Sequence, residues 1–175
     1  MTPSLASLAD LSDREMIRDT LARIARGEDR RDAALLQGCY WPDAAVDFGV
    51  FVGDFDAYLA WVVPGSSAIP VTLHTLGQSL IRLAGDGAAV ETHVTAYHRI
   101  EMGAEARDIV LGGRYLDRFA RRDGEWRVAH RTMLYDWQRD LGRSADWSQG
   151  LMGMPLLTDH AIGAAIGDHS ETFFE

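Results

Sequence analysis

Two residues far apart in the sequence carry the side chains needed for general acid–base catalysis. His74 lies in the alternating segment 71–76 (VTLHTL), where Thr72 and Leu76 share its face. If this face is turned to a cavity, a neutral imidazole can act there as a general base. Such a base needs a carboxylate that fixes its tautomer and stabilises the imidazolium, and Asp29 is the candidate. Simpler roles also fit, because a single strand histidine is often structural and Asp29 in GEDRRD can be a solvated cap.

The other residues that could carry chemistry fit neither a metal site nor a cofactor site. His93 and His98 are five residues apart on an expected strand, so they point to opposite faces and cannot chelate one ion. Gly112-Gly113 lies inside a strand and is no phosphate loop, and neither a GxSxG elbow nor a dinucleotide-binding fingerprint occurs. We therefore expect no metal and no cofactor. The six histidines are at positions 74, 93, 98, 130, 160 and 169.

Length and composition are those of an ordinary globular protein. The chain has 175 residues, of which 47% are hydrophobic and 25% charged, so we expect one domain over residues 1–175 with a real core. The formal net charge of -9 argues against binding to nucleic acid or to anionic membranes, since both need a basic surface.

The single cysteine, Cys39, excludes a disulfide within the chain and is typical of a reducing cytosol. Its apolar neighbours Leu35, Leu36, Tyr40 and Trp41 favour a buried structural thiol over a catalytic one. No apolar run is long enough to span a bilayer, and the acidic N-terminal segment lacks the basic start of a signal peptide. These features predict a cytoplasmic protein.

Helical signals fill the first third of the chain. Ser12 and Glu15 match a capping box for a helix over about 13–27, which Gly27 can end, although the segment DRRD can also continue it. A short helix capped by Asp32 follows, then a break at 42–43 and a strand at 45–48. A third helix is expected from residue 54 or 56 to residue 64.

From residue 69 the hydrophobic period changes to two. Strands are expected at 71–83 and 89–101, followed by a long hairpin over 107–137 that turns at Asp123-Gly124, a favoured hairpin dipeptide. Helices first and an antiparallel meander afterwards indicate an α+β layer arrangement. Residues 138–175 mix apolar residues with Gly and Ser, which indicates an ordered but irregular tail that either closes a cavity or reaches a neighbouring subunit, unless its last ten residues are simply mobile.

The second strand of the hairpin carries an unusual mixture of side chains. Strict alternation places one set on one face: Trp126, Val128, His130 and Thr132. The opposite face then mixes a guanidinium, a thioether and a phenol at Arg131, Met133 and Tyr135. This mixture suits the wall of a ligand cavity better than a plain core or a plain surface.

The three helices, the long antiparallel sheet and the segment RRDGEWRVAHR at 121–131 resemble the SnoaL-like branch of the NTF2-like superfamily. The resemblance covers about residues 10–137, and it is greatest to lindane dehydrochlorinase, scytalone dehydratase and bile-acid 7α-dehydratase enzymes. It implies a cone in which N-terminal helices pack on a strongly curved, mostly antiparallel sheet that encloses a cavity. Function is less constrained, because this fold hosts many unrelated activities.

The resemblance extends to the two candidate catalytic residues. In the dehydrochlorinases the helix segment IGVD ends in the aspartate of a dyad, and Asp29 of ARGED occupies that place. The dyad histidine lies at the start of the first long strand, where this chain has His74. The resemblance therefore implies a catalytic Asp29–His74 pair.

Further cavity positions follow from the dehydrochlorinase strand LIGGTY, which aligns without a gap with VLGGRY at 110–115. In this register Arg131 can bind an oxyanion or a leaving group, Tyr115 or Tyr135 can donate a proton, and each can equally be a packing or rim residue. His98 becomes a candidate second acid or base. Some dehydratases have a tyrosine on the first helix, where this chain has an isoleucine. The remaining expected cavity residues are Ile24, Thr72, Ala96, Leu111 and Met133.

These residues together predict a cofactor-independent lyase of aromatic compound catabolism, acting on a hydrophobic aromatic or polycyclic small molecule. His74 takes a proton while Asp29 steadies it, and water, HX or a small carbonyl fragment leaves, as in dehydration, HX elimination or deformylation. An isomerase with the same dyad is the nearest alternative. Others are a non-catalytic binding protein, in which the two residues do not touch, and an accessory subunit like the β subunits of ring-hydroxylating dioxygenases. The resemblance also implies a homo-oligomer, with a trimer favoured over a dimer.

Overall fold

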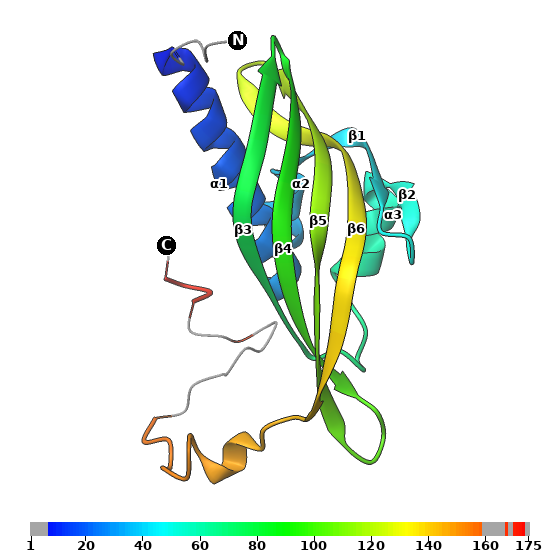
Figure 1. Ribbon diagram of the computed structural model, residues 1–175, viewed down its shortest axis with the longest axis vertical. Helices are drawn as coiled ribbons and strands as arrows, with labels where there is room; N and C mark the ends of the chain where they lie inside the picture. The colour runs from blue at the N-terminus through cyan, green and yellow to red at the C-terminus, as the bar shows by residue number, and fades with distance from the viewer. Residues whose placement is uncertain (1–6, 159–166, 168–169, 174–175) are drawn as a thin grey trace.

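The computed structural model describes residues 7–158, 167 and 170–173, and in this part of the chain a curved sheet is covered on one side by helices (Figure 1). The sheet has six strands in the order β2-β1-β6-β5-β4-β3, and all neighbours are antiparallel except β1 and β6. The α+β arrangement expected from the sequence is confirmed. The strands are β1 (Tyr40–Asp47), β2 (Val52–Asp54), β3 (Val71–Ala84), β4 (Gly87–Glu101), β5 (Ala106–Arg122) and β6 (Glu125–Arg143).

The first helix, α1 (Leu8–Arg30), is longer at both ends than the sequence indicates. Its capping box is formed by Ser7 and Asp10, not by Ser12 and Glu15, which lie inside the helix. The helix begins at the earlier cap, where Ser7 has the extended backbone that an N-cap requires. The helix buries one stripe against the sheet, consisting of Ile17, Leu21, Ile24 and Ala25.

Gly27 does not end the helix, contrary to the simplest expectation. A Cβ atom here would lie 2.8 Å from the Leu36 side chain, so the glycine allows the second helix, α2 (Ala33–Gln37), to approach closely. The helix ends instead at Arg31, whose φ of 53° is left-handed. This extra turn carries Glu28 and Asp29 within the helix, over the start of β3.

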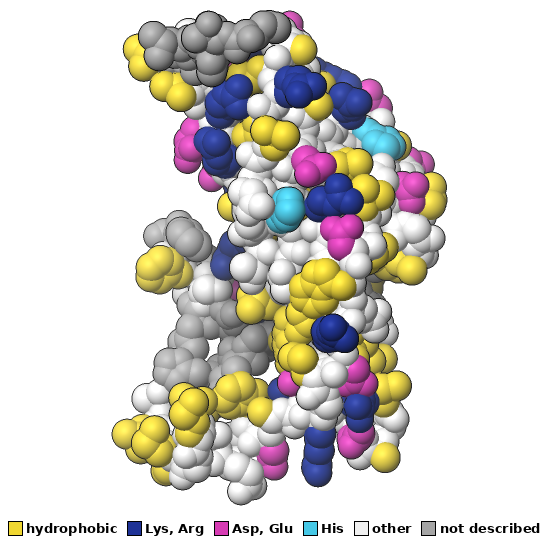
Figure 2. All heavy atoms as spheres, in the orientation of Figure 1, with side chains coloured by type: hydrophobic (Ala, Val, Ile, Leu, Met, Phe, Trp, Pro, Cys, Tyr) yellow, Lys and Arg dark blue, Asp and Glu magenta, His cyan; other side chains and the backbone are white. Residues whose placement is uncertain are grey.

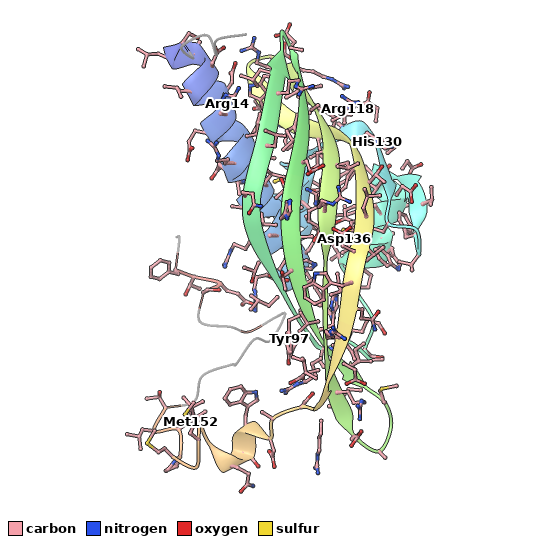
Figure 3. The ribbon with its side chains drawn as sticks, viewed as in Figure 1. Arg14, Tyr97, Arg118, His130, Asp136 and Met152 are labelled. Carbon is pink, nitrogen blue, oxygen red and sulfur yellow. The ribbon has the colours of Figure 1, made fainter. Side chains whose placement is uncertain are left out.

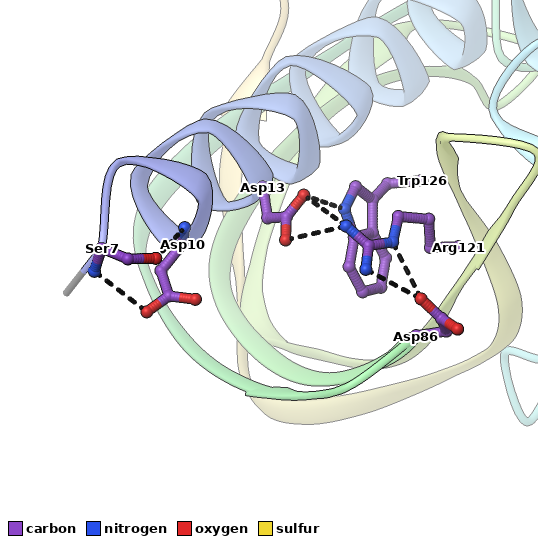
Figure 4. A network of polar contacts seen from close by, with 6 residues as sticks. All are labelled: Ser7, Asp10, Asp13, Asp86, Arg121 and Trp126. Atoms are coloured by element: carbon purple, nitrogen blue, oxygen red, sulfur yellow. Dashed lines mark hydrogen bonds and ion pairs between the residues drawn. The ribbon is translucent and has the colours of Figure 1, made fainter.

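A polar clasp fixes the other half of α1 to the turn end of the sheet (Figure 4). Asp13 accepts hydrogen bonds from the Trp126 indole at 2.9 Å and from Arg121 at 3.2 Å. Arg121 also binds Asp86, in the turn between β3 and β4, at 2.8 Å. The helix is therefore anchored at this end by side-chain contacts, and its last turn is placed by packing at the other end.

The segment between α1 and β3 also departs from the sequence prediction. β1 begins at Tyr40, so that Pro42 and Asp43 lie inside a strand and not in a break. This is tolerated because Pro42 lies in the irregular part of the β1–β6 pairing, between the paired residues 40 and 45. The short strand β2 was not expected, and α3 (Phe55–Val62) is capped by Asp54 as expected.

The alternation of β6 reverses at a bulge. The β5–β6 register passes over Ala129, so Trp126 and Val128 are buried together with Arg131, whereas His130 is exposed. The predicted face shared by Trp126, Val128 and His130 is therefore wrong, since strict alternation does not anticipate the extra residue. On the outer face of the sheet, charged side chains of both signs lie between apolar ones (Figure 2), and His130 projects from this face (Figure 3).

Two glycines let β5 and β6 pack closely beside the cavity. A Cβ atom on Gly113 would lie 2.0 Å from the carbonyl oxygen of Leu134, and one on Gly112 would lie 2.2 Å from the Trp137 ring. The register also shifts between these two glycines. The pair therefore serves close backbone approach in a strand, consistent with the view that it is no phosphate loop.

After β6, residues 144–158 lie beyond the end of the sheet, whereas Ser170 lies beside α1 and accepts hydrogen bonds from Arg26 (Figure 1). Residues 144–158 contain the short 3-10 helix η1 (Trp147–Gln149) and an isolated bridge between Leu151 and Met154. Met152 and Leu157 are almost fully exposed. No helix in the described part of the chain is long and apolar enough to cross a membrane.

Candidate active site

A cavity of about 640 Å³ lies between the helices and the inner face of the sheet. Its size is in the range of small-molecule sites. Aromatic rings dominate its wall, and Phe48 stacks on Tyr58 with ring centroids 5.7 Å apart. Its polar lining residues, apart from the tyrosines, are Glu28, Arg31, Ser66, Thr72, His74, His98 and Gln138. The aromatic and histidine residues that line it are Phe48, Tyr58, Trp61, His74, His98, Tyr115 and Tyr135.

Asp29 and His74 are in direct contact at the inner end of this site. Asp29 Oδ1 lies 2.7 Å from His74 Nδ1, and Asp29 Oδ2 accepts the backbone N–H of His74 at 2.9 Å. Thr72 donates its hydroxyl to the same carboxylate at 3.1 Å. Asp29 is buried and does not line the cavity, whereas His74 does. A carboxylate bound in this way places the proton on Nδ1 and leaves Nε2 as the reactive nitrogen.

A second carboxylate approaches the same imidazole from the other side. Glu28 Oε2 lies 3.6 Å from His74 Nε2, and Glu28 Oε1 accepts the Tyr58 hydroxyl at 2.6 Å. Both Glu28 and Tyr58 line the cavity. Because Glu28 and Asp29 are adjacent in a helix, their side chains diverge by about 100°, which allows them to bracket one ring.

A buried arginine, Arg131, balances the negative charge of Glu28. Arg131 Nη1 lies 3.6 Å from Glu28 Oε1, and Arg131 binds Asp117 through two hydrogen bonds of 2.8 and 2.9 Å. The guanidinium also lies 4.0 Å from the centroid of the Tyr115 ring. Only 1% of the Arg131 side chain is exposed. Arg131 therefore lies beneath the cavity wall, where it contacts the surrounding carboxylates and aromatic rings.

The two cavity histidines titrate in opposite directions. Burial by itself lowers the pKa of His74, but the hydrogen bond to Asp29 and the negative charge of Glu28 outweigh it, so the pKa lies above the usual 6.5. Burial lowers the pKa of His98 to about 4, and the neighbouring charge of His74 acts in the same direction. Their ring centroids are 6.0 Å apart. At neutral pH His98 is thus an uncharged hydrogen-bonding group and His74 is the group that can hold a proton.

The residues expected to line the cavity divide into two sets. Ile24 does not line it, because it packs in the hydrophobic core under α1, and Arg131 does not line it, because Asp117 and Tyr115 enclose it. Tyr135 lies at the wall and donates its hydroxyl to the carbonyl oxygen of Phe48 at 3.0 Å. The expected residues that do line the cavity are Thr72, Ala96, His98, Leu111, Tyr115, Met133 and Tyr135.

Glu28, Tyr58 and Asp117 were missed by sequence reasoning. Glu28 stands directly before Asp29. The only signal that could have found it was the possible continuation of the first helix past Gly27. Tyr58 lies among apolar residues of α3, where no local pattern marks it as a partner of a carboxylate. Asp117 lies between Tyr115 and Phe119 on the buried face of β5, and an acidic residue at a core position is a recognisable sign of a buried partner.

Cys39 is fully buried, and this burial raises the pKa of its thiol to about 11. It is therefore an unreactive structural thiol, as the sequence indicated. Among the described residues, no group of three His, Cys, Asp or Glu side chains could hold a metal ion. His93 and His98 lie on opposite faces of β4, while His160 and His169 fall outside the described residues.

Comparison with known sequences identifies the family. The model of the SnoaL-like domain matches residues 9–132. The chain belongs to the SnoaL-like family. An uncharacterised relative in Mycobacterium tuberculosis (strain ATCC 25618 / H37Rv) is 27% identical over 140 residues, covering 78% of this chain and 94% of that protein.

Solved structures place this SnoaL-like chain in the NTF2-like fold. A type 2 hexachlorocyclohexane dehydrochlorinase aligns with a TM-score of 0.71 and 19% identity, over 81% of this chain and 98% of the other. A scytalone dehydratase candidate from Novosphingobium aromaticivorans aligns with a TM-score of 0.67 and 22% identity, over 78% and 92% of the two chains. At these identities the likeness shows the fold. The superfamily expected from the sequence is confirmed.

Proposed function

We propose that this SnoaL-like protein is a cofactor-independent lyase that acts on a hydrophobic aromatic or polycyclic small molecule. His74 removes a proton from the substrate, and water, HX or a small carbonyl fragment leaves. The observation that carries the proposal is the 2.7 Å contact between Asp29 and His74 Nδ1, with the ring at a cavity wall. A non-catalytic binding protein would not need this contact.

The surroundings of His74 support its role as a general base. Asp29 holds the tautomer that leaves Nε2 without a proton, and it stabilises the imidazolium that forms when the proton arrives. The raised pKa of His74 moves the base toward the strength needed to take a proton from carbon. Only 12% of the His74 side chain is exposed, so these electrostatic interactions are weakly screened by water.

The cavity also supports the substrate class. Its wall is mainly aromatic and aliphatic, with His74, His98 and Glu28 converging from the inner end. A flat, hydrophobic molecule can stack on the rings while its reactive edge meets the histidine. The solved neighbours include a protein named as a dehydrochlorinase and one named as a dehydratase candidate. Both names denote eliminations, in agreement with this class.

The ring opening of nitrobenzisoxazole tests the proposal without knowledge of the natural substrate. In this reaction a base takes a proton from carbon, the N–O bond breaks and a coloured phenolate forms. We expect the wild-type protein to accelerate it and the His74→Gln variant to lose about 10²-fold or more. Equal rates for the two proteins, both folded, would contradict the proposal. Product analysis with a natural substrate then separates elimination from isomerisation.

A further inference from the structure

Glu28 occupies a position that the dyad alone does not explain. Its carboxylate lines the cavity and stands 3.6 Å from His74 Nε2, on the reactive side of the ring. The Tyr58 hydroxyl and Arg131 both lie at Oε1, so that Oε2 is left for His74 and the cavity. Glu28 is thus presented to a bound substrate together with the base.

The charges around this pair call for one further proton. Three buried carboxylates, Glu28, Asp29 and Asp117, face a single buried guanidinium, that of Arg131. Two of them lie in the last turn of α1, where the helix dipole disfavours negative charge. One proton, on either His74 Nε2 or Glu28 Oε2, relieves this excess, whichever atom carries it. Further titratable groups that interact with the pair are Tyr58, Tyr40, Tyr115 and the neutral His98.

We propose that His74 and Glu28 share one proton, and that Glu28 is the acid that protonates the departing group while His74 removes the proton from carbon. This inference rests on the elimination proposed above. It assigns Arg131 and Tyr58 as positioning residues, because they contact Glu28 and hold its carboxylate in place.

The step balances without any proton from solvent. In the reactive form Glu28 is a carboxylic acid and His74 is neutral, with its proton on Nδ1. The C–H electrons form the new double bond, the proton passes to Nε2, the C–O bond breaks, and the leaving oxygen takes the Glu28 proton and departs as water. The site is then an imidazolium beside a carboxylate. The water that has formed can relay the proton from Nε2 to Oε2, which restores the starting form.

The separation of the two atoms fits this division of labour. At 3.6 Å, Nε2 and Oε2 are too far apart for a direct hydrogen bond. One edge of a substrate can therefore meet both, with the C–H bond at His74 and the leaving oxygen at Glu28. Base and acid then lie on the same side of the substrate, which predicts syn elimination.

Two probes that differ in their leaving group test the acid role. In 4-phenoxybutan-2-one and 4-(4-nitrophenoxy)butan-2-one a base removes the proton beside the carbonyl and a phenolate leaves, and these flexible chains can place both bonds on the same side. The phenolate without the nitro group is more basic and gains more from an acid. For Glu28→Gln we expect a loss of about 10²-fold on 4-phenoxybutan-2-one and of less than about 10-fold on the nitro compound. Glu15→Gln is the matched control, because Glu15 is an exposed carboxylate on the same helix and should leave both rates unchanged. A ratio of the two rates that is the same in Glu28→Gln and wild type would overturn the inference.

Nitrogen-15 NMR of the His74 ring gives a second measurement that needs no substrate. A shared proton predicts that Glu28→Gln lowers the pKa of His74 by about one unit or more, while Glu15→Gln does not change it. An unchanged His74 titration in a folded Glu28→Gln protein would also overturn the inference. If instead wild type is no faster than His74→Gln on either probe, the base itself fails, and the proposed function falls together with the acid.

Discussion

Replacing Asp29 by Asn separates the orienting role of this residue from its role in stability. The carboxylate accepts three hydrogen bonds, from the Thr72 hydroxyl, the His74 backbone N–H and His74 Nδ1. An asparagine with its NH₂ toward the backbone N–H would leave that donor buried and unpaired, at a cost of about 1–3 kcal/mol. With the NH₂ toward Nδ1, every donor keeps a partner, because the Thr72 hydroxyl can rotate. The second orientation is therefore preferred.

This orientation of the asparagine amide reverses the tautomer of the His74 imidazole. Nδ1 must accept from the amide, so the ring proton moves to Nε2 and the base is lost. We expect Asp29→Asn to keep the wild-type free energy of unfolding within about 1 kcal/mol, yet to lose about 10²- to 10⁴-fold in nitrobenzisoxazole opening. Asp29→Ala should instead lose about 1–3 kcal/mol of stability as well, because it leaves the backbone N–H without an acceptor.

Urea denaturation and the ring-opening rate measure these two quantities on the same samples. Asp19→Asn is the control, since Asp19 is a mostly exposed aspartate on the same helix and should change neither. A folded Asp29→Asn protein with nearly wild-type activity would refute the reasoning, because Asp29 would then not determine the tautomer of His74.

Three further predictions follow from other parts of the structure. Gly113→Ala should lower the free energy of unfolding by about 3 kcal/mol or more in urea denaturation, because its Cβ would lie 2.0 Å from a backbone oxygen; a small effect would contradict the close strand approach. Cys39 should react with a thiol reagent only when the protein unfolds, because burial raises its pKa to about 11; fast labelling of folded protein would show that the thiol is accessible. Burial lowers the pKa of His98 to about 4, so as the pH falls the unfolded chain binds a proton before the folded chain does. The free energy of unfolding should therefore decline from about pH 6.5 toward pH 4 by about 1–3 kcal/mol, and by less in His98→Asn. An equal decline in both proteins would exclude His98 as its cause.

The sequence predicted the antiparallel meander of the sheet and the identity of the candidate pair, but not the edge formed by β1 and β2. Alternating patterns gave β3, β4 and the long hairpin, because each of these strands has one face toward the core. The turn at Asp123-Gly124 is confirmed, with positive φ at both residues. Asp29 and His74 were selected by resemblance, and the structure places their side chains in contact. Their catalytic role stays a prediction, as does the oligomeric state.

The parts that could not be predicted depend on contacts between distant segments. Helix α1 runs past Gly27 because Leu36 packs against it, and only this continuation brings Glu28 to His74. The burial of Arg131 depends on the bulge at Ala129, which no local pattern announces. In both cases the local preference of the chain allowed two outcomes, and tertiary packing decided between them.

The position of the proton on the His74 ring is the central claim of this account. Nitrogen-15 NMR of the wild-type imidazole, recorded well above its pKa, reports this directly. We expect the proton on Nδ1, in a strong hydrogen bond to Asp29, and Nε2 without a proton and facing the cavity. A ring that carries its proton on Nε2 under these conditions would contradict the proposed base.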